Sequence, residues 1–300
     1  MYVVTGATGN TGSVVANRLL AEGRKVRVIS RNADRLRPFV TRGAEAIVAD
    51  LSDPAALTRA FTGAEAVYAM IPPDLSSQDF RAEQRRVSEA MAGALEQSGV
   101  KHTVALSSFG ADKEAGTGPV AGLHEFENRL NRIAGLNVLY LRAGYFMENT
   151  LGQAAAIRAM GKMAGPLRGD LKLPFIATQD IGAAAAELLL KLDFTGKQTR
   201  ELLGQRDLSY NQVTEIIGKA IEKPDLQYVQ FPGEQIKPVF IHLGMSANMA
   251  DLILEMSAAL NSGHMRALEA RSAHNTTPTS FETFVAGQFV PLYQQQASAA

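Results

Sequence analysis

The chain has 300 residues, which is the length of one large domain or of two average ones. Its 30 basic residues balance its 30 acidic residues, so no net charge attracts it to nucleic acid or to an anionic membrane. The absence of Cys excludes disulfides, cysteine nucleophiles and thiolate metal sites. No apolar run reaches the roughly 18–20 residues of a membrane helix, and no basic leader precedes the first apolar residues. We therefore expect a cytoplasmic protein that binds neither nucleic acid nor membranes.

In the first half of the chain, short apolar runs alternate with longer helical patterns. The runs are apolar on both faces, as strands buried in a parallel sheet are: Val3–Thr5, Lys25–Ser30, Ala46–Ala49, Ala66–Ile71, Thr103–Ser107 and Val138–Leu141. Amphipathic helix patterns lie between them: Thr11–Glu22, Pro54–Phe61, Ser77–Gln97 and Gly122–Ile133. Asp53 is expected to cap the second of these helices. The alternation predicts an α/β fold, a Rossmann-type doubly wound parallel sheet with helices on both faces.

The second half of the chain contains more helix and less strand. Four helices are predicted there: Asp180–Leu192, Ser209–Ala220, Met245–Leu260 and Phe281–Tyr293. Two short strands, Glu201–Gly204 and Leu226–Gln230, are also predicted, and Gln294–Ala300 is expected to be a frayed tail. We therefore expect a Rossmann domain over residues 1–150. A smaller, mostly helical, substrate-side domain is expected over residues 151–300, partly interwoven with the first.

A glycine-rich loop, Thr5-Gly6-Ala7-Thr8-Gly9-Asn10-Thr11-Gly12, joins the first strand to the first helix. In this context Gly6 allows a tight turn, Gly9 lets the backbone approach a pyrophosphate, and Gly12 lets the helix pack closely on the strand. The N–H groups and the dipole at the start of the helix favour an anion. The alternative is a tight turn without a ligand. We interpret the loop as the phosphate-binding loop of a dinucleotide site, with cofactor contacts at Gly6, Thr8, Gly9, Asn10, Thr11 and Gly12.

Two positions further along indicate which dinucleotide binds. Arg31 follows the second strand, about twenty residues after the loop, where an acidic residue would favour NAD and an arginine suits the 2′-phosphate of NADP. Arg35 and Arg37 are close enough in sequence to help. Asp50 and Leu51 follow the third strand, where the carboxylate can accept from the adenine amino group while the leucine packs on the ring. The alternatives are that Arg31 is an exposed residue at a helix start and that Asp50 caps a helix or a turn.

These features together resemble the NmrA-like family of atypical short-chain dehydrogenase/reductases. The resemblance also rests on two further runs, Leu141-Arg142-Ala143-Gly144-Tyr145-Phe146-Met147-Glu148-Asn149 and Pro174-Phe175-Ile176-Ala177-Thr178-Gln179-Asp180-Ile181-Gly182. The family includes NADPH-dependent quinone reductases, a triphenylmethane dye reductase and cofactor-sensing regulators without catalytic activity. The resemblance implies a smaller domain that closes a cleft, residues that line the nicotinamide end of the cofactor and residues that cover its middle. These are Gly144, Tyr145 and Phe146, and Met70, Ile71 and Pro72, respectively.

The sequence departs from the better-known short-chain dehydrogenases at their catalytic Tyr and Lys. Ser107 and Ser108 stand where the substrate-orienting Ser of those enzymes lies, but Val120 and His124 occupy the Tyr and Lys positions. Val120 cannot donate a proton. His124 is our candidate for a catalytic and ribose-binding residue, and a partly exposed helix histidine is the alternative. Tyr145 is the nearest alternative phenol, but in this motif we expect it to pack against the cofactor.

The missing proton donor affects which acceptor the protein can reduce. Reducing a simple ketone generates an alkoxide, which is costly at neutral pH without a positioned acid. A quinone gives a resonance-stabilised anion that water can protonate, and a conjugated dye or a nitro or azo acceptor has a similar advantage. We therefore predict an NADPH-dependent oxidoreductase that transfers hydride to a quinone or a similar conjugated acceptor. The alternative is a non-catalytic regulator that senses NADP(H); a homodimer is compatible with either.

The remaining candidate features are weaker. The five His residues have no metal-ligand spacing, so no metal site is predicted. Charged residues of two helices are interpreted as solvated faces: Arg81, Glu83, Arg85, Arg86 and Glu89, with i,i+4 pairing, and Glu125, Glu127, Arg129 and Arg132. Met245, Met249 and Met256 form either an apolar wall for a flat substrate or plain core. The segment Gly110–Gly118 is either a mobile lid or a loop without a role.

Overall fold

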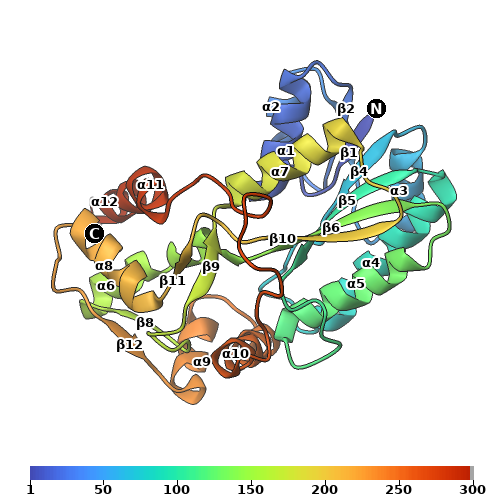
Figure 1. Ribbon diagram of the computed structural model, residues 1–300. Helices are drawn as coiled ribbons and strands as arrows, with labels where there is room; N and C mark the ends of the chain where they lie inside the picture. Colours follow the sequence, from blue (N-terminus) through green and yellow to red (C-terminus); the bar gives the residue numbers. More distant parts are fainter. Residues whose placement is uncertain (298–300) are drawn as a thin grey trace.

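A seven-stranded sheet forms the larger part of the computed structural model, which describes residues 1–297 (Figure 1). Its strands are β1 (Tyr2–Val4), β2 (Val26–Ser30), β3 (Glu45–Val48), β4 (Ala66–Ala69), β5 (His102–Ser108), β6 (Asn137–Ala143) and β10 (Lys197–Leu202). They are arranged in the order β10-β6-β5-β4-β1-β2-β3, and every neighbouring pair is parallel. The order reverses between β1 and β4, and doubly wound sheets bind ligands at the carboxyl ends of strands at this point. The predicted Rossmann-type fold is confirmed.

Helices cover both faces of this sheet. On one face lie α1 (Asn10–Ala21) and α7 (Thr178–Lys191), and on the other α3 (Pro54–Phe61), α4 (Phe80–Ser98) and α5 (Ala121–Asn131). Because successive residues of a strand point to opposite faces, Val4 joins the core beneath α1 and Val3 joins the core beneath α3 and α4. The predicted cap of α3 is confirmed, since the Asp53 carboxylate accepts from the backbone N–H of Ala56 at 3.0 Å.

Strand β3 differs from the prediction. All six strands predicted in the first half are present with small shifts at their ends. However, β3 lies at the sheet edge and pairs with β2 alone, so most of its residues are exposed and Val48 is 59% exposed. The expectation that every strand is buried on both faces is therefore wrong for β3. Two short helices that precede it, η1 (Asp34–Leu36) and α2 (Arg37–Val40), were not predicted.

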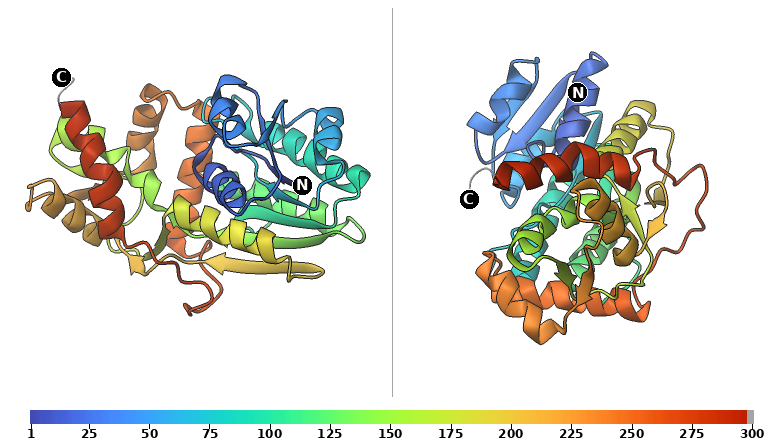
Figure 2. Two further views of the ribbon diagram at one scale, coloured as in Figure 1. Left: turned by 90° about the horizontal axis from the view of Figure 1, so that it is seen from above. Right: turned by 90° about the vertical axis from the view of Figure 1, so that its left-hand side faces the viewer.

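A smaller, mostly helical region begins where β6 ends and lies at the carboxyl end of the sheet (Figure 2). Its short strands are β7 (Tyr145–Phe146), β9 (Leu173–Ile176) and β11 (Asp207–Leu208) in one sheet, and β8 (Met163–Gly165) and β12 (Tyr228–Gln230) in another. Its helical segments are η3 (Met147–Thr150), α6 (Gln153–Met160), α8 (Tyr210–Ala220), α9 (Gly233–His242), α10 (Ala247–Ser262), α11 (Phe281–Phe284), a π-helical turn (Val285–Phe289) and α12 (Val290–Ala297). They surround a core that includes Phe175, Tyr210 and Phe281.

The second half of the chain follows the prediction in its long helices and departs from it elsewhere. Ser209 caps α8, and Gln212 completes a capping box, which confirms this helix start. The strand predicted at Glu201–Gly204 is longer, begins earlier and joins the main sheet as β10. The strands β8, β9 and β11 and the helices α6 and α9 were not predicted. Residues 294–297 belong to α12, so a frayed tail is wrong there, and 298–300 lie outside the described residues.

The segment between α10 and α11 folds back along the β10 edge (Figure 1). The carboxylate of Glu201 is buried in β10 and accepts from the backbone N–H groups of Leu268 and Glu269, each at 2.8 Å. Arg271 donates to the carbonyl oxygen of Leu203 at 3.0 Å. Backbone donors and a buried acceptor therefore fasten this segment to the sheet.

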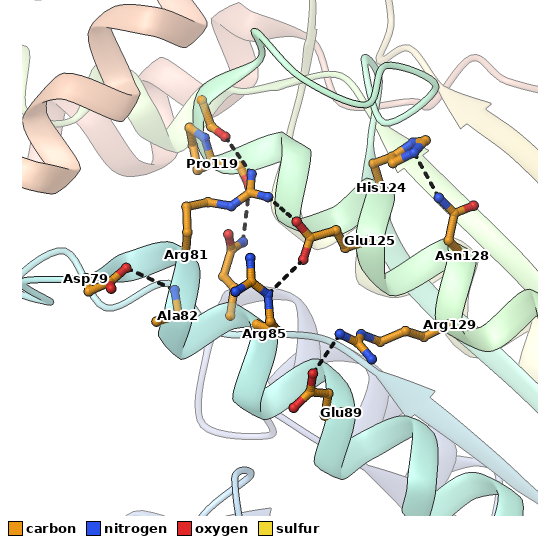
Figure 3. A network of polar contacts seen from close by, with 12 residues as sticks. Asp79, Arg81, Ala82, Arg85, Glu89, Pro119, His124, Glu125, Asn128 and Arg129 are labelled. Atoms are coloured by element: carbon orange, nitrogen blue, oxygen red, sulfur yellow. Dashed lines mark hydrogen bonds and ion pairs between the residues drawn. The ribbon is translucent and has the colours of Figure 1, made fainter.

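The charged residues of α4 and α5 pair between the two helices rather than within them (Figure 3). Arg81 and Arg85 both reach Glu125, at 2.5 and 3.5 Å, and Arg129 reaches Glu89 at 2.7 Å. The predicted i,i+4 pairing on separate solvated faces is therefore wrong, because the two helices pack side by side.

Glu127, expected on a solvated face, is instead buried and only 5% exposed. Its carboxylate accepts from the hydroxyl of Ser107 at 2.6 Å and from Nε and Nη2 of Arg142 at 3.0 and 2.6 Å. This cluster joins α5 to the ends of β5 and β6. Ser107, which lies where the better-known dehydrogenases place their substrate-orienting residue, therefore donates its hydroxyl proton to Glu127.

We predict that Glu127→Ala lowers the free energy of unfolding by about 3–5 kcal/mol, because it leaves the Arg142 guanidinium buried without its partner. Glu125→Ala is the control, since its partly exposed ion pairs are worth about 0–1 kcal/mol. Urea unfolding followed by circular dichroism measures both. Equal losses in the two variants would show that the Glu127 cluster contributes no more than a surface pair.

Candidate functional site

A side chain is disfavoured at two of the three glycines of the loop, by the positive φ and the Met70 contact at Gly6 and by the loop backbone at Gly12. Gly6 has a φ of +61°, and a Cβ atom there would lie 2.3 Å from Sδ of Met70. A Cβ atom on Gly12 would lie 2.3 Å from the carbonyl oxygen of Gly6, so the first turn of α1 rests directly on the loop. Gly9 is exposed, and a Cβ atom there would have that same oxygen, at 3.3 Å, as its one neighbour within 4 Å.

The first turn of α1 has no side-chain cap and contains no acidic residue. Side chains cap five other helices, α3, α4, α8, α10 and α11, whereas α5, α6 and α9 lack a side-chain cap as α1 does. The N–H groups at the start of α1 have no partner within the helix, and they carry the positive end of its dipole. The loop and helix start therefore fit a pyrophosphate, at the point where the strand order reverses.

Two threonines of the loop turn their side chains inward. The phenol of Tyr68 donates to Oγ1 of Thr11 at 2.9 Å, and Thr11 is buried. Oγ1 of Thr5 accepts from the N–H of Met70 at 2.9 Å and fixes the end of β4 beside the loop. The Thr11 hydroxyl is therefore buried against Tyr68, whereas Asn10 is exposed.

After β4 the chain passes over the loop. Met70 covers Gly6, Ile71 is buried, and Pro72 is exposed. These three residues therefore lie beside the glycine loop, where a bound dinucleotide would pass them.

Three arginines follow β2, and they differ in their partners. Nη2 of Arg35 donates to the carbonyl oxygen of Thr8 at 2.8 Å, so this side chain reaches the glycine loop. Arg37 forms an ion pair with Asp34 at 2.8 Å. Arg31 is exposed and forms no hydrogen bond or ion pair with residues 1–297. Its guanidinium is therefore free to bind an anionic group at the carboxyl end of β2.

Asp50 caps a turn, which is the alternative considered from sequence. Its Oδ1 accepts from the N–H and the hydroxyl of Ser52 at 2.8 and 2.7 Å. These two hydrogen bonds lower the pKa of Asp50, and the charge of Arg31 adds to their effect. Leu51 is half-buried against the core beneath α3. Contact of this pair with an adenine ring stays a prediction.

At the other end of the site, the chain leaves β6 through a close crossing of backbones. A Cβ atom on Gly144 would lie 2.3 Å from the carbonyl oxygen of Pro174, so only glycine fits there. Tyr145 and Phe146 then form β7, which pairs with β9. Phe146 packs against the core of the large sheet, whereas Tyr145 packs against the core of the smaller region. The two side chains thus mark the boundary between the two cores.

The two residues at the dehydrogenase Tyr and Lys positions both interact with other parts of the protein. Val120 is buried, 5% exposed. Nδ1 of His124 donates to the carbonyl oxygen of Ala111 at 2.8 Å, and Nε2 accepts from the side-chain amide of Asn128 at 2.8 Å (Figure 3). Because a carbonyl oxygen only accepts, Nδ1 carries the proton of this hydrogen bond. The bonding of His124 therefore resembles that of a structural histidine.

Three polar residues near Tyr145 were missed by sequence reasoning. Glu148 accepts from the N–H and hydroxyl of Thr178 at 2.9 and 2.6 Å, which anchors the start of α7, and burial raises its pKa. Tyr210 donates to the phenol oxygen of Tyr145 at 3.1 Å, and Asn149 lowers the pKa of that phenol. Glu148 and Asn149 stand in the run that carries the family resemblance, but Tyr210 is 65 residues from Tyr145 and gave no signal.

The weaker sequence features have structural roles. Met249 is buried, which favours the core alternative. The segment Gly110–Gly118 packs beneath α10, since a Cβ atom on Gly118 would lie 2.0 Å from the carbonyl oxygen of Leu252. Residues 1–297 contain no group of three or more His, Asp or Glu side chains placed to hold a metal ion. A search of the same residues for helices of sufficient length and hydropathy to span a membrane finds none.

Known proteins resemble this chain over most of its length. The NmrA-like family matches residues 2–285. An NAD(P)H azoreductase from Xenophilus azovorans is 30% identical over 261 residues, 86% of each protein. The structure of an NADPH-dependent quinone oxidoreductase from Escherichia coli, complexed with NADPH, is 25% identical and superimposes with a TM-score of 0.79, covering 96% of this chain and 100% of that one.

The fold is also that of the negative transcriptional regulator NmrA in complex with NADP. That structure is 16% identical, with a TM-score of 0.67 over 100% of this chain and 98% of the other. At this identity the likeness concerns the fold alone. The family match, together with the azoreductase relative, identifies this chain as a member of the NmrA-like family.

Proposed function

We propose that the protein is an NADPH-dependent oxidoreductase that transfers hydride to a conjugated small-molecule acceptor such as a quinone or an azo compound. The observation that carries the proposal is the uncapped start of α1, which rests on a loop closed to side chains at Gly6 and Gly12. Free backbone donors at this position suit a dinucleotide pyrophosphate. The relatives named as an NAD(P)H azoreductase and an NADPH-dependent quinone oxidoreductase support the same reaction class.

Each part of the site has a role in this proposal. The backbone of Gly9–Gly12 binds the pyrophosphate, and Arg31 binds the 2′-phosphate, with Arg35 beside it. Asp50 and Leu51 contact the adenine, and residues 70–72 cover the middle of the cofactor. Residues 144–146 line its nicotinamide end. The bound cofactor supplies the hydride, while the protein binds, orients and excludes water.

Both ring nitrogens of His124 are hydrogen-bonded to the protein, and Val120 is apolar. These two observations favour an acceptor whose reduced anion is stabilised by conjugation. Neither residue offers a free acid to a substrate. The same observation favours the second candidate, a regulator that binds NADP(H) without turning it over. Consumption of NADPH in the presence of an acceptor distinguishes the oxidoreductase from the regulator.

Arg31→Ala is expected to weaken NADPH binding by about 10–100-fold, because a hydrogen bond to a charged group is worth about 1.5–3 kcal/mol. NADH lacks the 2′-phosphate, so its dissociation constant is expected to change little. Isothermal titration measures both. Arg37→Ala is the matched control, since that arginine is already paired with Asp34. Equal losses for NADPH and NADH in Arg31→Ala would reject the 2′-phosphate assignment.

Gly12→Ala is expected to weaken NADPH and NADH alike, by about tenfold or more, a loss of about 1.4 kcal/mol or more. The added Cβ atom meets the Gly6 carbonyl and must displace the loop. Gly93→Ala is the control, because a Cβ atom there has no neighbour within 4 Å. Titration with circular dichroism of each variant checks the result. Unchanged affinity in a folded Gly12→Ala variant contradicts the cradle.

Purified protein is expected to oxidise NADPH only when a quinone or an azo dye is present. The loss of the reduced-nicotinamide absorbance and the loss of dye colour measure the two half-reactions. Gly12→Ala serves as the binding-impaired control. Tight NADPH binding without consumption across a panel of both acceptor classes would establish the regulator instead.

A further inference from the structure

The phenol of Tyr145 occupies the point where β6 leads out of the large sheet. Its ring meets Phe175 edge-on, with centroids 5.3 Å apart, and Tyr210 in the same manner at 6.2 Å. Both of these neighbours are buried, but Tyr145 itself is only half-buried. Tyr145 therefore lies at the carboxyl end of the sheet with part of its surface open, where doubly wound sheets bind their ligands.

The hydrogen bonds of Tyr145 leave its own proton unused. The hydroxyl of Tyr210 donates to the Tyr145 oxygen at 3.1 Å. The nearby side chain of Asn149 lowers the pKa of Tyr145. A phenol oxygen has two lone pairs and one proton. The Tyr210 hydroxyl engages one lone pair, and the Tyr145 hydroxyl donates no hydrogen bond to an acceptor among residues 1–297.

This arrangement suits a proton donor. Burial raises the pKa of Tyr145, so the phenol keeps its proton at neutral pH. Tyr210, which donates to the phenol oxygen, and Asn149 both lower the same pKa, which favours the phenolate once the proton has left. By contrast, the hydroxyl of Tyr228 in the same aromatic cluster donates to the carbonyl oxygen of Leu167 at 2.8 Å, and its proton is therefore committed.

We propose that Tyr145 is the catalytic proton donor to the reduced acceptor, and that Tyr210 and Asn149 are positioning residues that stabilise its phenolate. The inference rests on the proposed function. For an azo acceptor, one nitrogen gains the hydride given up by NADPH, and the N=N π electrons move to the other nitrogen. That nitrogen takes the proton as the O–H bond of Tyr145 breaks. The products are NADP⁺, a hydrazo compound and a phenolate, which regains its proton from water.

The contribution of Tyr145 depends on the basicity of the anion it protonates. A reduced quinone spreads its negative charge over the ring and both oxygens, so water can protonate it. Conjugation also stabilises the anion from an azo group or from an unsaturated lactone, a further class of conjugated acceptor. Each of these anions is nevertheless a stronger base than a reduced quinone and gains more from a positioned acid. General acid catalysis contributes about 10²–10⁴-fold.

The test compares Tyr145→Phe, Tyr210→Phe and Tyr228→Phe with the unchanged protein, using NADPH and three acceptors: a benzoquinone, an azo dye and an unsaturated lactone. Tyr145→Phe is expected to lower kcat on the dye or the lactone by about 10²–10⁴-fold, and on the quinone by much less. The dissociation constant for NADPH is expected to change far less than kcat, because phenylalanine keeps the ring that lines the nicotinamide end. Tyr210→Phe is expected to lower kcat on the same acceptors to a smaller extent with little change in KM.

Tyr228→Phe is the matched control, because it removes a hydroxyl from the same cluster that does not bond Tyr145. A solvent deuterium isotope effect on dye or lactone reduction is expected in the unchanged protein. If Tyr145→Phe leaves kcat on the dye and the lactone unaltered, the inference about Tyr145 is overturned while the proposed function stands. The same holds if kcat on the quinone falls as much as kcat on the dye and the lactone. Reduction of the quinone but of neither other acceptor by the unchanged protein also overturns it. Turnover of no acceptor at all overturns the proposed function together with this inference.

Discussion

The site depends on the backbone N–H groups in the first turn of α1, which have no hydrogen-bond partner within the helix. Every helix start has backbone N–H groups without a partner inside the helix, and proteins usually satisfy them with a side chain. This chain does so at α3, α4, α8 and α10, but not at α5, α6, α9 or α1, and of these four α1 alone follows the glycine loop. Because Gly12 rests on the Gly6 carbonyl, the loop holds the donors in place and keeps side chains away from them. The geometry of the rest of the site is arranged around these donors.

The two halves of the site are joined through α7. A Cβ atom on Gly182 would lie 2.7 Å from the carbonyl oxygen of Thr11, so α7 contacts α1 backbone to backbone near the glycine loop. The start of α7 is anchored by Glu148, which follows β7 and lies three residues after Tyr145. The acceptor side and the cofactor side are therefore linked through one helix. This contact explains why the run from Leu141 and the run to Gly182 stand together in one functional unit.

Sequence reasoning was accurate where a local pattern has a single physical cause. The loop glycines, the Asp53 cap and the Ser209 cap depend on neighbours within a few residues, and all were predicted correctly as structural elements. Reasoning failed where the partner is distant. Glu127 reads as a solvated charge until α5 is placed against Arg142 and Ser107, and Tyr210 meets Tyr145 only after the smaller region folds. The helix α9 was missed because Pro238 interrupts its pattern.

The position of β10 affects how a growing polypeptide can acquire this structure. β10 completes the sheet beside β6, yet it follows α6, β8, β9 and α7 in the chain. During synthesis the outer edge of β6 stays unpaired until Lys197–Leu202 leaves the ribosome, and unpaired edges invite association with other chains. The hydrogen bonds to the Glu201 carboxylate form later still, because their donors are the backbone N–H groups of residues 268 and 269. Fragments that end before residue 197 would therefore carry an aggregation-prone edge, however complete their glycine loop.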